Sequence, residues 1–288
     1  MNILKYRYIT YVFSLILVLN SVYFLVFKGL NFSTEFTGGT KIVFTSSQNQ
    51  DDVNKELKNI LNTDYKISKS NSSYSVDVSQ SFDPSKITEI KGKLSSEIKD
   101  YNMENLEVVQ PSVGHELIYK TLIAVGISIV VIFIFIWYAF KDFLSSLSAM
   151  FAMLHDTIIL VGTFSVFSYF LHAEIDLLFV TAVLTVLSFS LYDTIVIFDK
   201  IRDLYNKSKT TDYYFLINKS ISQTMVRSIN NSLTSIIVLF ALALFVQGSL
   251  FWFTLALLLG VILGTYSSPF VAATLYFDLR GLKKKLKR

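Results

Sequence analysis

Cysteine is absent from this chain of 288 residues, proline occurs only 3 times, and charged side chains make up 17% of the composition. The lack of cysteine excludes disulfides, zinc–thiolate sites, iron–sulfur clusters and thiol nucleophiles. A typical soluble domain is about 25% charged, so the low charge argues against an ordinary soluble enzyme. Hydrophobic residues reach 52%, and phenylalanine alone occurs 25 times, which also excludes intrinsic disorder.

Six apolar runs are long enough to cross a bilayer, because about 20 helical residues span the hydrocarbon core. The first run is longer than a signal-peptide core and has no Ala-x-Ala-like site after it, so we expect a retained anchor. The predicted helices cover about Tyr8–Phe27, Leu117–Phe140, Leu147–Leu171, Leu177–Phe198, Ser228–Val246 and Phe251–Phe277.

Basic residues are unevenly divided between the predicted loops. Loops 141–146 and 199–222 contain Lys or Arg, whereas loops 172–176 and 247–250 contain neither. The positive-inside rule therefore predicts a multi-pass protein of the cytoplasmic (inner) membrane with both termini in the cytoplasm. The last nine residues hold six of the 26 basic side chains. The net charge of +4 thus comes from this tail and does not indicate a partner nucleic acid.

Residues 29–114 have a different composition, rich in acidic residues, Ser and Asn. Their apolar spacing predicts the order strand, helix, strand, strand, helix, strand, which is the ferredoxin-like split βαβ pattern. Asp51 or Asp52 is expected to cap the first helix and Asp83 the second. The predicted elements are Thr40–Phe44, Asp51–Leu61, Tyr65–Ser68, Tyr74–Val78, a helix from Asp83-Pro84, and Leu106–Val109.

The predicted fold class is therefore an α-helical membrane protein with six transmembrane helices and a small extracytoplasmic α+β ferredoxin-like domain. Residues 1–28 would form the first transmembrane helix and its cytoplasmic N-terminus, and residues 29–114 the extracytoplasmic domain. Residues 115–278 would form the five-helix bundle, and residues 279–288 a basic cytoplasmic tail.

Two ionisable residues fall within or beside the apolar part of the predicted bundle. Asp193 lies six residues, about 9 Å, from the helix end at Asp199, too deep for a short carboxylate to reach water easily. Arg227 begins a polar face on the next helix, and such a face does not turn toward lipid. Asp193 and Arg227 could meet, either in a proton pathway or as a static clamp between helices. The supporting polar face consists of Asn230, Asn231, Thr234 and Ser235.

Other patterns point to packing and not to chemistry. His155 and Asp156 are interpreted as a polar pair at the cytoplasmic end of the third helix. Gly260 and Gly264 form a Gly-x-x-x-Gly pattern, which predicts close helix packing. The 3 histidines are scattered, so no metal site is predicted, and no P-loop or nucleophile motif occurs. We therefore expect no enzyme and no cofactor, and any work must draw on an ion gradient or a partner.

Four segments together resemble the SecF members of the SecD/SecF protein-export family. They are Gly29–Thr40, Tyr192–Arg202, Arg227–Thr234 and Gly264–Ser268. In this resemblance Asp193 matches the family's membrane aspartate and Arg227 its membrane arginine, and both are linked there to the proton pathway. The resemblance implies a fold related to the exporters of the resistance–nodulation–division superfamily.

The resemblance also implies a function. The chain would be an accessory subunit of the Sec export machinery, using proton-motive force to promote polypeptide translocation. Its implied partners are a SecD-like subunit, the Sec translocon channel, the translocating polypeptide and the lipid membrane. Two alternatives stay open: a scaffold without its own ion coupling, and half of a small-molecule exporter. The sequence does not distinguish protons from sodium ions, because carboxylates serve either.

Overall fold

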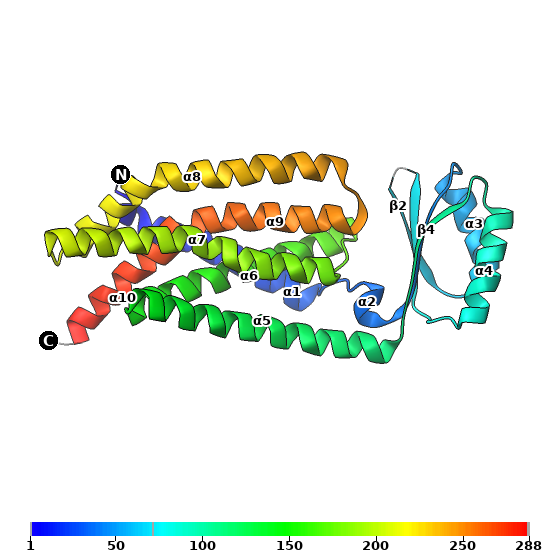
Figure 1. Ribbon diagram of the computed structural model, residues 1–288, viewed down its shortest axis with the longest axis horizontal. Coiled ribbons are helices and arrows are strands. Elements are labelled where there is room, and N and C mark those ends of the chain that lie inside the picture. The colour runs from blue at the N-terminus through cyan, green and yellow to red at the C-terminus, as the bar shows by residue number, and fades with distance from the viewer. Residues whose placement is uncertain (1, 71, 287–288) are drawn as a thin grey trace. The chain divides into compact units, whose positions relative to one another are not determined.

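The computed structural model describes residues 2–70 and 72–286 and divides into two compact units (Figure 1). The helical unit comprises the described parts of Met1–Asn31, Ala124–Glu174 and Leu178–Arg288. The α+β unit comprises the described parts of Phe32–Ile123, together with Ile175–Leu177. Each unit has its own hydrophobic core.

Six segments among the described residues are long and apolar enough to cross a membrane, which confirms the predicted number. A 3₁₀ turn, η1 (Ile3–Tyr6), precedes the first of them. The segments are α1 (Arg7–Phe27), α5 (Pro111–Phe140), α6 (Phe143–Leu171), α7 (Leu177–Ser208), α8 (Tyr213–Phe245), and a last span made of α9 (Gly248–Ser267), η2 (Ser268–Ala272) and α10 (Ala273–Leu286).

Two helices extend well beyond their apolar runs, so the loop predicted over 199–222 is wrong. α7 continues through its charged segment to Ser208, and α8 already begins at Tyr213. Asp212 caps α8, because its Oδ1 accepts hydrogen bonds from the backbone N–H groups of Tyr214 and Phe215 at 3.0 and 3.2 Å. Lys and Arg are good helix formers in water. The apolar pattern therefore marks the part of a helix that lies in lipid and not its end.

The last span changes its winding at Pro269. Proline has no N–H to donate and its ring clashes with the preceding turn of an α-helix. The chain takes the wider π-helical turn η2 at this point before α10 begins. The Ser268 hydroxyl donates to the carbonyl oxygen of Gly264 at 2.9 Å. This turn places Ser267 and Ser268 in the interior of the helical unit.

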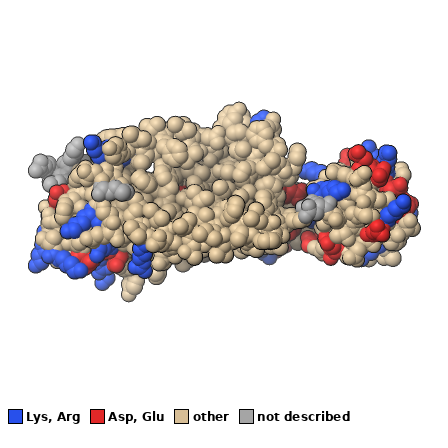
Figure 2. Space-filling model, turned by 90° about the horizontal axis from the view of Figure 1, so that it is seen from above, with Lys and Arg blue, Asp and Glu red and all other residues tan. Residues whose placement is uncertain are grey.

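Basic side chains gather at one end of the helical unit, and few charged side chains are visible along the rest of this unit in the view of Figure 2. The two terminal segments meet near that end. The Tyr11 hydroxyl of α1 donates to Asp278 Oδ2 of α10 at 2.8 Å, and Arg7 Nε lies 3.3 Å from Asp278 Oδ1. Both described chain ends therefore belong to the same end of the helical unit.

The α+β unit has the predicted ferredoxin-like topology. Its four-stranded sheet has the order β2-β3-β1-β4, and every neighbouring pair is antiparallel. Helices α3 and α4 cover one face of this sheet (Figure 1). The elements are β1 (Gly39–Thr45), α3 (Gln50–Leu61), β2 (Tyr65–Ser70), β3 (Ser73–Val78), α4 (Pro84–Glu97) and β4 (Asn102–Val109).

The helix starts in this unit agree only partly with the prediction. Asp83 occupies the N-cap of α4 as expected, with Pro84 at the first helical position, but its side chain makes no capping hydrogen bond. The N-cap of α3 is Asn49, so the prediction of Asp51 or Asp52 was wrong. Both aspartates lie in the first turn of α3, where negative charge is also favourable because of the helix dipole.

Two adjacent glycines form the entry to β1, after the short helix α2 (Thr34–Thr37). Gly38 has φ +77°, and a Cβ atom there would lie 2.6 Å from the Pro111 Cα. Gly39 has φ +140°, and a Cβ atom would lie 2.3 Å from the Val78 carbonyl oxygen. Only glycine fits both the backbone angles and the close approach.

Asp77 on β3 provides a test of the electrostatics of the α+β unit. Burial raises the pKa of this carboxyl group, against the opposing influence of Lys41, whose Nζ lies 4.0 Å from Oδ1. A raised pKa gives stability that is present below the unfolded-state pKa and lost as pH rises through the folded-state pKa. We therefore expect Asp77→Asn to raise the unfolding temperature of this unit at neutral pH and to reduce its dependence on pH.

The measurement is limited proteolysis of the full chain in bilayers along a temperature ramp, at acid and neutral pH. Asp51→Asn is the control, because Asp51 is exposed on α3. A lower unfolding temperature for Asp77→Asn at neutral pH, or equal shifts in both variants, contradicts the expectation.

Candidate site in the membrane helices

Three ionisable side chains share one level of the helical unit. At 1.5 Å per residue, Asp156 lies about 22 Å from the C-terminal end of α6. Asp193 lies about 24 Å from the N-terminal end of α7, and Arg227 about 27 Å from the C-terminal end of α8. These helix ends lie at the same end of the unit, opposite the basic one (Figures 1 and 2). Each of these distances is well over half of the thickness of a hydrocarbon core, which is about 30 Å. All three groups therefore lie nearer to the basic side of the membrane than to the opposite side.

Asp156 joins three helices through its carboxyl group. It is completely buried, with an exposed fraction of 0%. Its Oδ2 accepts hydrogen bonds from Ser190 Oγ of α7 at 2.6 Å and from Ser267 Oγ of α9 at 2.5 Å. Its Oδ1 lies 2.9 Å from Nδ1 of the adjacent His155. Both carboxyl oxygens therefore have partners in the interior of the bundle.

The interpretation of His155 and Asp156 as a polar pair at a helix end is wrong. α6 begins at Phe143, so Asp156 lies about 20 Å from the start of its helix. The Ser148 hydroxyl, two turns before it, donates to the carbonyl oxygen of Leu144 within the same helix at 2.7 Å. A sequence pattern could not reveal Ser190 and Ser267 as partners of Asp156, because they come from other helices.

Asp193 occupies a second polar position one turn beyond Ser190 on α7. It is 5% exposed, and its carboxyl group faces the hydroxyl groups of Ser228 and Ser232 on α8. Ser232 is held in turn by Thr265 of α9, whose hydroxyl donates to it at 2.6 Å. No hydrogen-bond partner for Asp193 Oδ1 occurs within residues 2–70 and 72–286.

Asp193 and Arg227 are not brought together in this structure. Arg227 is exposed and forms no ion pair within the described part of the chain. Ser228 and Ser232, one turn apart, occupy the side of α8 toward Asp193. Arg227 precedes Ser228 by one residue and so points about 100° away around the helix.

The rest of the predicted polar face of α8 also lies outside the helical unit. Asn230, Asn231 and Thr234 are exposed and Ser235 is half-buried. The Thr234 hydroxyl donates to the Asn230 carbonyl oxygen at 2.9 Å. The side-chain amides of Asn230 and Asn231 and the Arg227 guanidinium are therefore exposed on the part of α8 that would lie in the membrane.

Gly260 and Gly264 let α9 approach α7 closely, as the Gly-x-x-x-Gly pattern predicts. A Cβ atom at Gly264 would lie 2.9 Å from the Ser190 Cα atom. A Cβ atom at Gly260 would lie 2.1 Å from Val186 Cγ2. The short hydrogen bonds of Ser190 and Ser267 to Asp156 depend on this approach.

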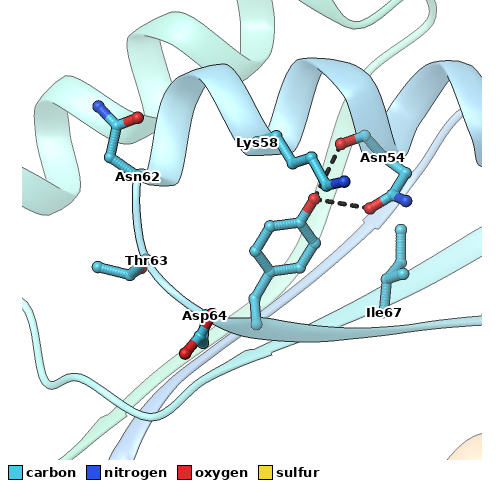
Figure 3. Close-up of a pocket in the computed structure, with 7 residues that line it drawn as sticks. Asn54, Lys58, Asn62, Thr63, Asp64 and Ile67 are labelled. Carbon is cyan, nitrogen blue, oxygen red and sulfur yellow. Dashed lines mark hydrogen bonds between the residues drawn. The ribbon is translucent and has the colours of Figure 1, made fainter.

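A depression on the surface of the α+β unit is lined by residues of α3, β2 and the segment that joins them (Figure 3). The Tyr65 hydroxyl lies 2.8 Å from the Asn54 carbonyl oxygen and 2.6 Å from its Oδ1, which ties β2 to α3. The lining also includes Lys58, Asn62, Thr63, Asp64 and Ile67. No group of three His, Cys, Asp or Glu side chains that could hold a metal occurs in the described ranges.

Six spanning helices, an α+β unit inserted after the first, and carboxyl groups buried between helices define a multi-pass membrane protein with an ionisable interior. The profile described as protein export membrane protein SecD/SecF, C-terminal, matches residues 89–281. The profile described as the SecD/SecF GG motif matches residues 23–50, which include Gly38 and Gly39. The chain belongs to the SecD/SecF family of protein export membrane proteins.

Relatives and solved structures agree with this assignment. The protein translocase subunit SecF of Haemophilus influenzae is 33% identical over 98% of this chain and 86% of its own length. The subunit SecF of Sebaldella termitidis is 31% identical over 100% of this chain and 94% of its own length. The crystal structure of SecDF from Thermus thermophilus matches 98% of this chain with 26% identity and a TM-score of 0.85. This chain spans only 39% of that SecDF chain.

The close contact at Gly264 can be tested by substitution. We expect Gly264→Val to destabilise the helical unit by about 1–3 kcal/mol, because the added side chain forces α7 and α9 apart. Gly126→Val on α5 is the matched control, since a Cβ atom there meets nothing within 4 Å. The measurement is the fraction of monodisperse protein left after heating in detergent. Equal losses in both variants would contradict a special role for Gly264.

Proposed function

We propose that the chain is the accessory subunit of a Sec-type protein export machinery. It works with a SecD-like partner and uses ion movement across the membrane to promote polypeptide translocation. Membership of the SecD/SecF family supports the export role. The ion role is proposed for Asp193 and Arg227, with Asn230, Asn231, Thr234 and Ser235 as the polar face around them.

The observation that carries this proposal is the two-sided polarity of α8. Its inner side presents Ser228 and Ser232 to the buried Asp193. Its outer side exposes Arg227, Asn230 and Asn231 at nearly the same level. Lipid cannot satisfy a guanidinium or two amides, so a partner helix or a water-filled path has to cover them.

The length comparison supports a partner of related structure. This chain corresponds to 39% of the SecDF chain of known structure and to 34% of the protein translocase subunit SecDF of Brucella abortus. A SecD-like subunit would supply a second group of helices, as paired repeats do in transporters. The polar side of α8 is the surface proposed to meet it.

The proposed ion step uses the position of Arg227 one residue before Ser228. A rotation of α8 by about 100°, the angle of one residue, would replace Ser228 by Arg227 opposite Asp193. An opposite charge at hydrogen-bonding distance favours the ionised carboxylate, whereas a neutral hydroxyl does so less strongly. Alternation between the two arrangements would release and reload an ion on Asp193.

The proposed orientation follows from the charges. The basic end of the helical unit (Figure 2) would face the cytoplasm, with both termini there and residues 29–114 on the opposite side of the membrane. In this arrangement the α+β domain would contact the emerging polypeptide or the partner's domains. We likewise propose residues 115–278 as the five-helix bundle and residues 279–288 as a basic cytoplasmic tail.

The first test replaces the proposed ion carrier. We expect Asp193→Asn to reduce gradient-stimulated export to the level seen without this chain, because an amide cannot carry the ion. The measurement is translocation of a secreted reporter into inner-membrane vesicles that lack the native subunit, with and without a proton gradient. Asp199→Asn is the control, since Asp199 is exposed on the same helix. Normal stimulation with Asp193→Asn would refute the ion role.

The second test separates coupling from assembly. We expect Arg227→Leu to lose gradient-stimulated export while the SecD-like partner is still recovered with the chain. Arg202→Leu, an exposed arginine on α7, is the control. If export and partner recovery fall together in both Asp193→Asn and Arg227→Leu, the chain is a scaffold whose membrane charges are structural.

A further inference from the structure

The proposed ion step leaves the buried pair of Asp156 and His155 without a role. Asp156 has three partners, the hydroxyls of Ser190 and Ser267 and the His155 imidazole. His155 places Nδ1 against the carboxyl group, and its side chain is only 10% exposed. The opposite ring nitrogen, Nε2, is buried with no hydrogen-bond partner in the described ranges. A buried, unpaired ring nitrogen is unusual in a structural clamp.

Few other ionisable groups face this pair. Tyr266 of α9 is close enough to interact electrostatically with Asp156, and its hydroxyl lies 3.1 Å from Ser14 Oγ of α1. On α7 the nearest ionisable group is Asp193, one turn beyond Ser190. On α1, Tyr11 and Arg7 bind Asp278 of α10, and at the start of α6 Asp142 pairs with Arg280 of α10 at 2.9 Å. Among the ion pairs of the described residues, the only partner of Asp156 is therefore His155.

The spacing of the oxygen atoms favours a proton over a metal cation. Hard cations sit about 2.3–2.6 Å from each oxygen ligand, which keeps the ligand oxygens well apart from one another. Here the two serine oxygens lie 2.6 and 2.5 Å from Asp156 Oδ2, which is direct hydrogen-bond contact. The imidazole on Oδ1 would also repel a cation if it were protonated.

We propose that His155 and Asp156 form a proton-binding site in the membrane, distinct from Asp193. In the proton-free form Asp156 is a carboxylate and neutral His155 carries its hydrogen on Nδ1, so the pair has a charge of −1. One proton binds at Nε2 and brings the pair to zero charge. The hydrogen between Nδ1 and Oδ1, 2.9 Å apart, is then shared between imidazole and carboxyl group.

This site is connected to the proposed ion carrier through α7. Ser190 donates to Asp156 and lies one turn before Asp193 on the same helix. The next residue, Thr194, shares a hydrogen bond of 2.8 Å with Ser268 of η2. A change of charge on Asp156 thus acts on the contacts that hold α7 against α9. The consequence for export rests on the proposed function, whereas proton binding at His155 does not.

The experiment reads the protonation of His155 directly. The chain has 3 histidines, and the double variant His115→Gln/His172→Asn leaves only His155. Asparagine is chosen at position 172 because the backbone there is left-handed, with φ +55°. The full-length variant, labelled with ¹⁵N-histidine and assembled with its partner in bilayers, is followed by solid-state NMR. The range is about pH 5 to 8, where histidine titrates.

We expect the Nε2 signal to change from unprotonated to protonated across this range while Nδ1 stays protonated or hydrogen-bonded. With Asp156→Asn we expect about tenfold or more weaker proton binding, because the imidazolium loses its counter-charge. Asp199→Asn, exposed on α7, should leave the titration unchanged. If Asp156→Asn fails to fold, the titration of His155 in the double variant that retains Asp156 still tests the proposal.

Three outcomes overturn the proposal: no titration of His155, an identical titration with Asp156→Asn, or signals that respond to sodium ions and not to pH. The outcome is separable from that of the export assay. If His155 titrates as expected but Asp193→Asn exports normally, the proton site stands and the ion role proposed for Asp193 fails.

Discussion

The structure depends on one constraint: polar groups inside the hydrocarbon have to be satisfied by the bundle itself. Asp156 shows how this is met. Its Oδ2 accepts hydrogen bonds from serine hydroxyls of α7 and α9, and its Oδ1 faces the imidazole beside it. Each of these contacts requires helix backbones to lie close together, which Gly264 permits against Ser190. The fully buried carboxyl group and the close packing of three helices are therefore parts of one arrangement.

α8 meets the same constraint only on one side. Its serines face Asp193, and Ser232 is held by Thr265 of α9. Its other side leaves Arg227 and two asparagine side chains exposed. Within the described residues Asp156 is therefore satisfied, whereas Asp193 Oδ1 and His155 Nε2 lack hydrogen-bond partners and the outer side of α8 leaves polar groups exposed. This asymmetry is the physical reason to expect a partner at α8, a helix that also borders an ionisable interior.

The α+β unit is organised around its entry from the first helix. Gly38 and Gly39 turn the chain into β1 where no Cβ atom fits. The preceding segment binds the loop between α6 and α7, since Ser33 N–H donates to the Ile175 carbonyl oxygen and Glu35 Oε2 accepts from the Leu177 N–H. Burial raises the pKa of Glu35, with Asp176 and Glu107 adding to the effect. The glycine pair therefore belongs to a structural junction.

The sequence by itself determined the number of spanning helices, the order of elements in the α+β unit and the family, because apolar length, local periodicity and motifs are read along the chain. It also identified Asp193 and Arg227 as residues inside or beside the lipid-facing region. Only the tertiary structure decided which polar groups meet. In this structure Asp193 faces the serines of α8, and Arg227 is exposed on the outer side of that helix. Asp156 accepts hydrogen bonds from Ser190 and Ser267. The rotation of each helix about its axis depends on packing with helices distant in sequence, and no local pattern encodes it.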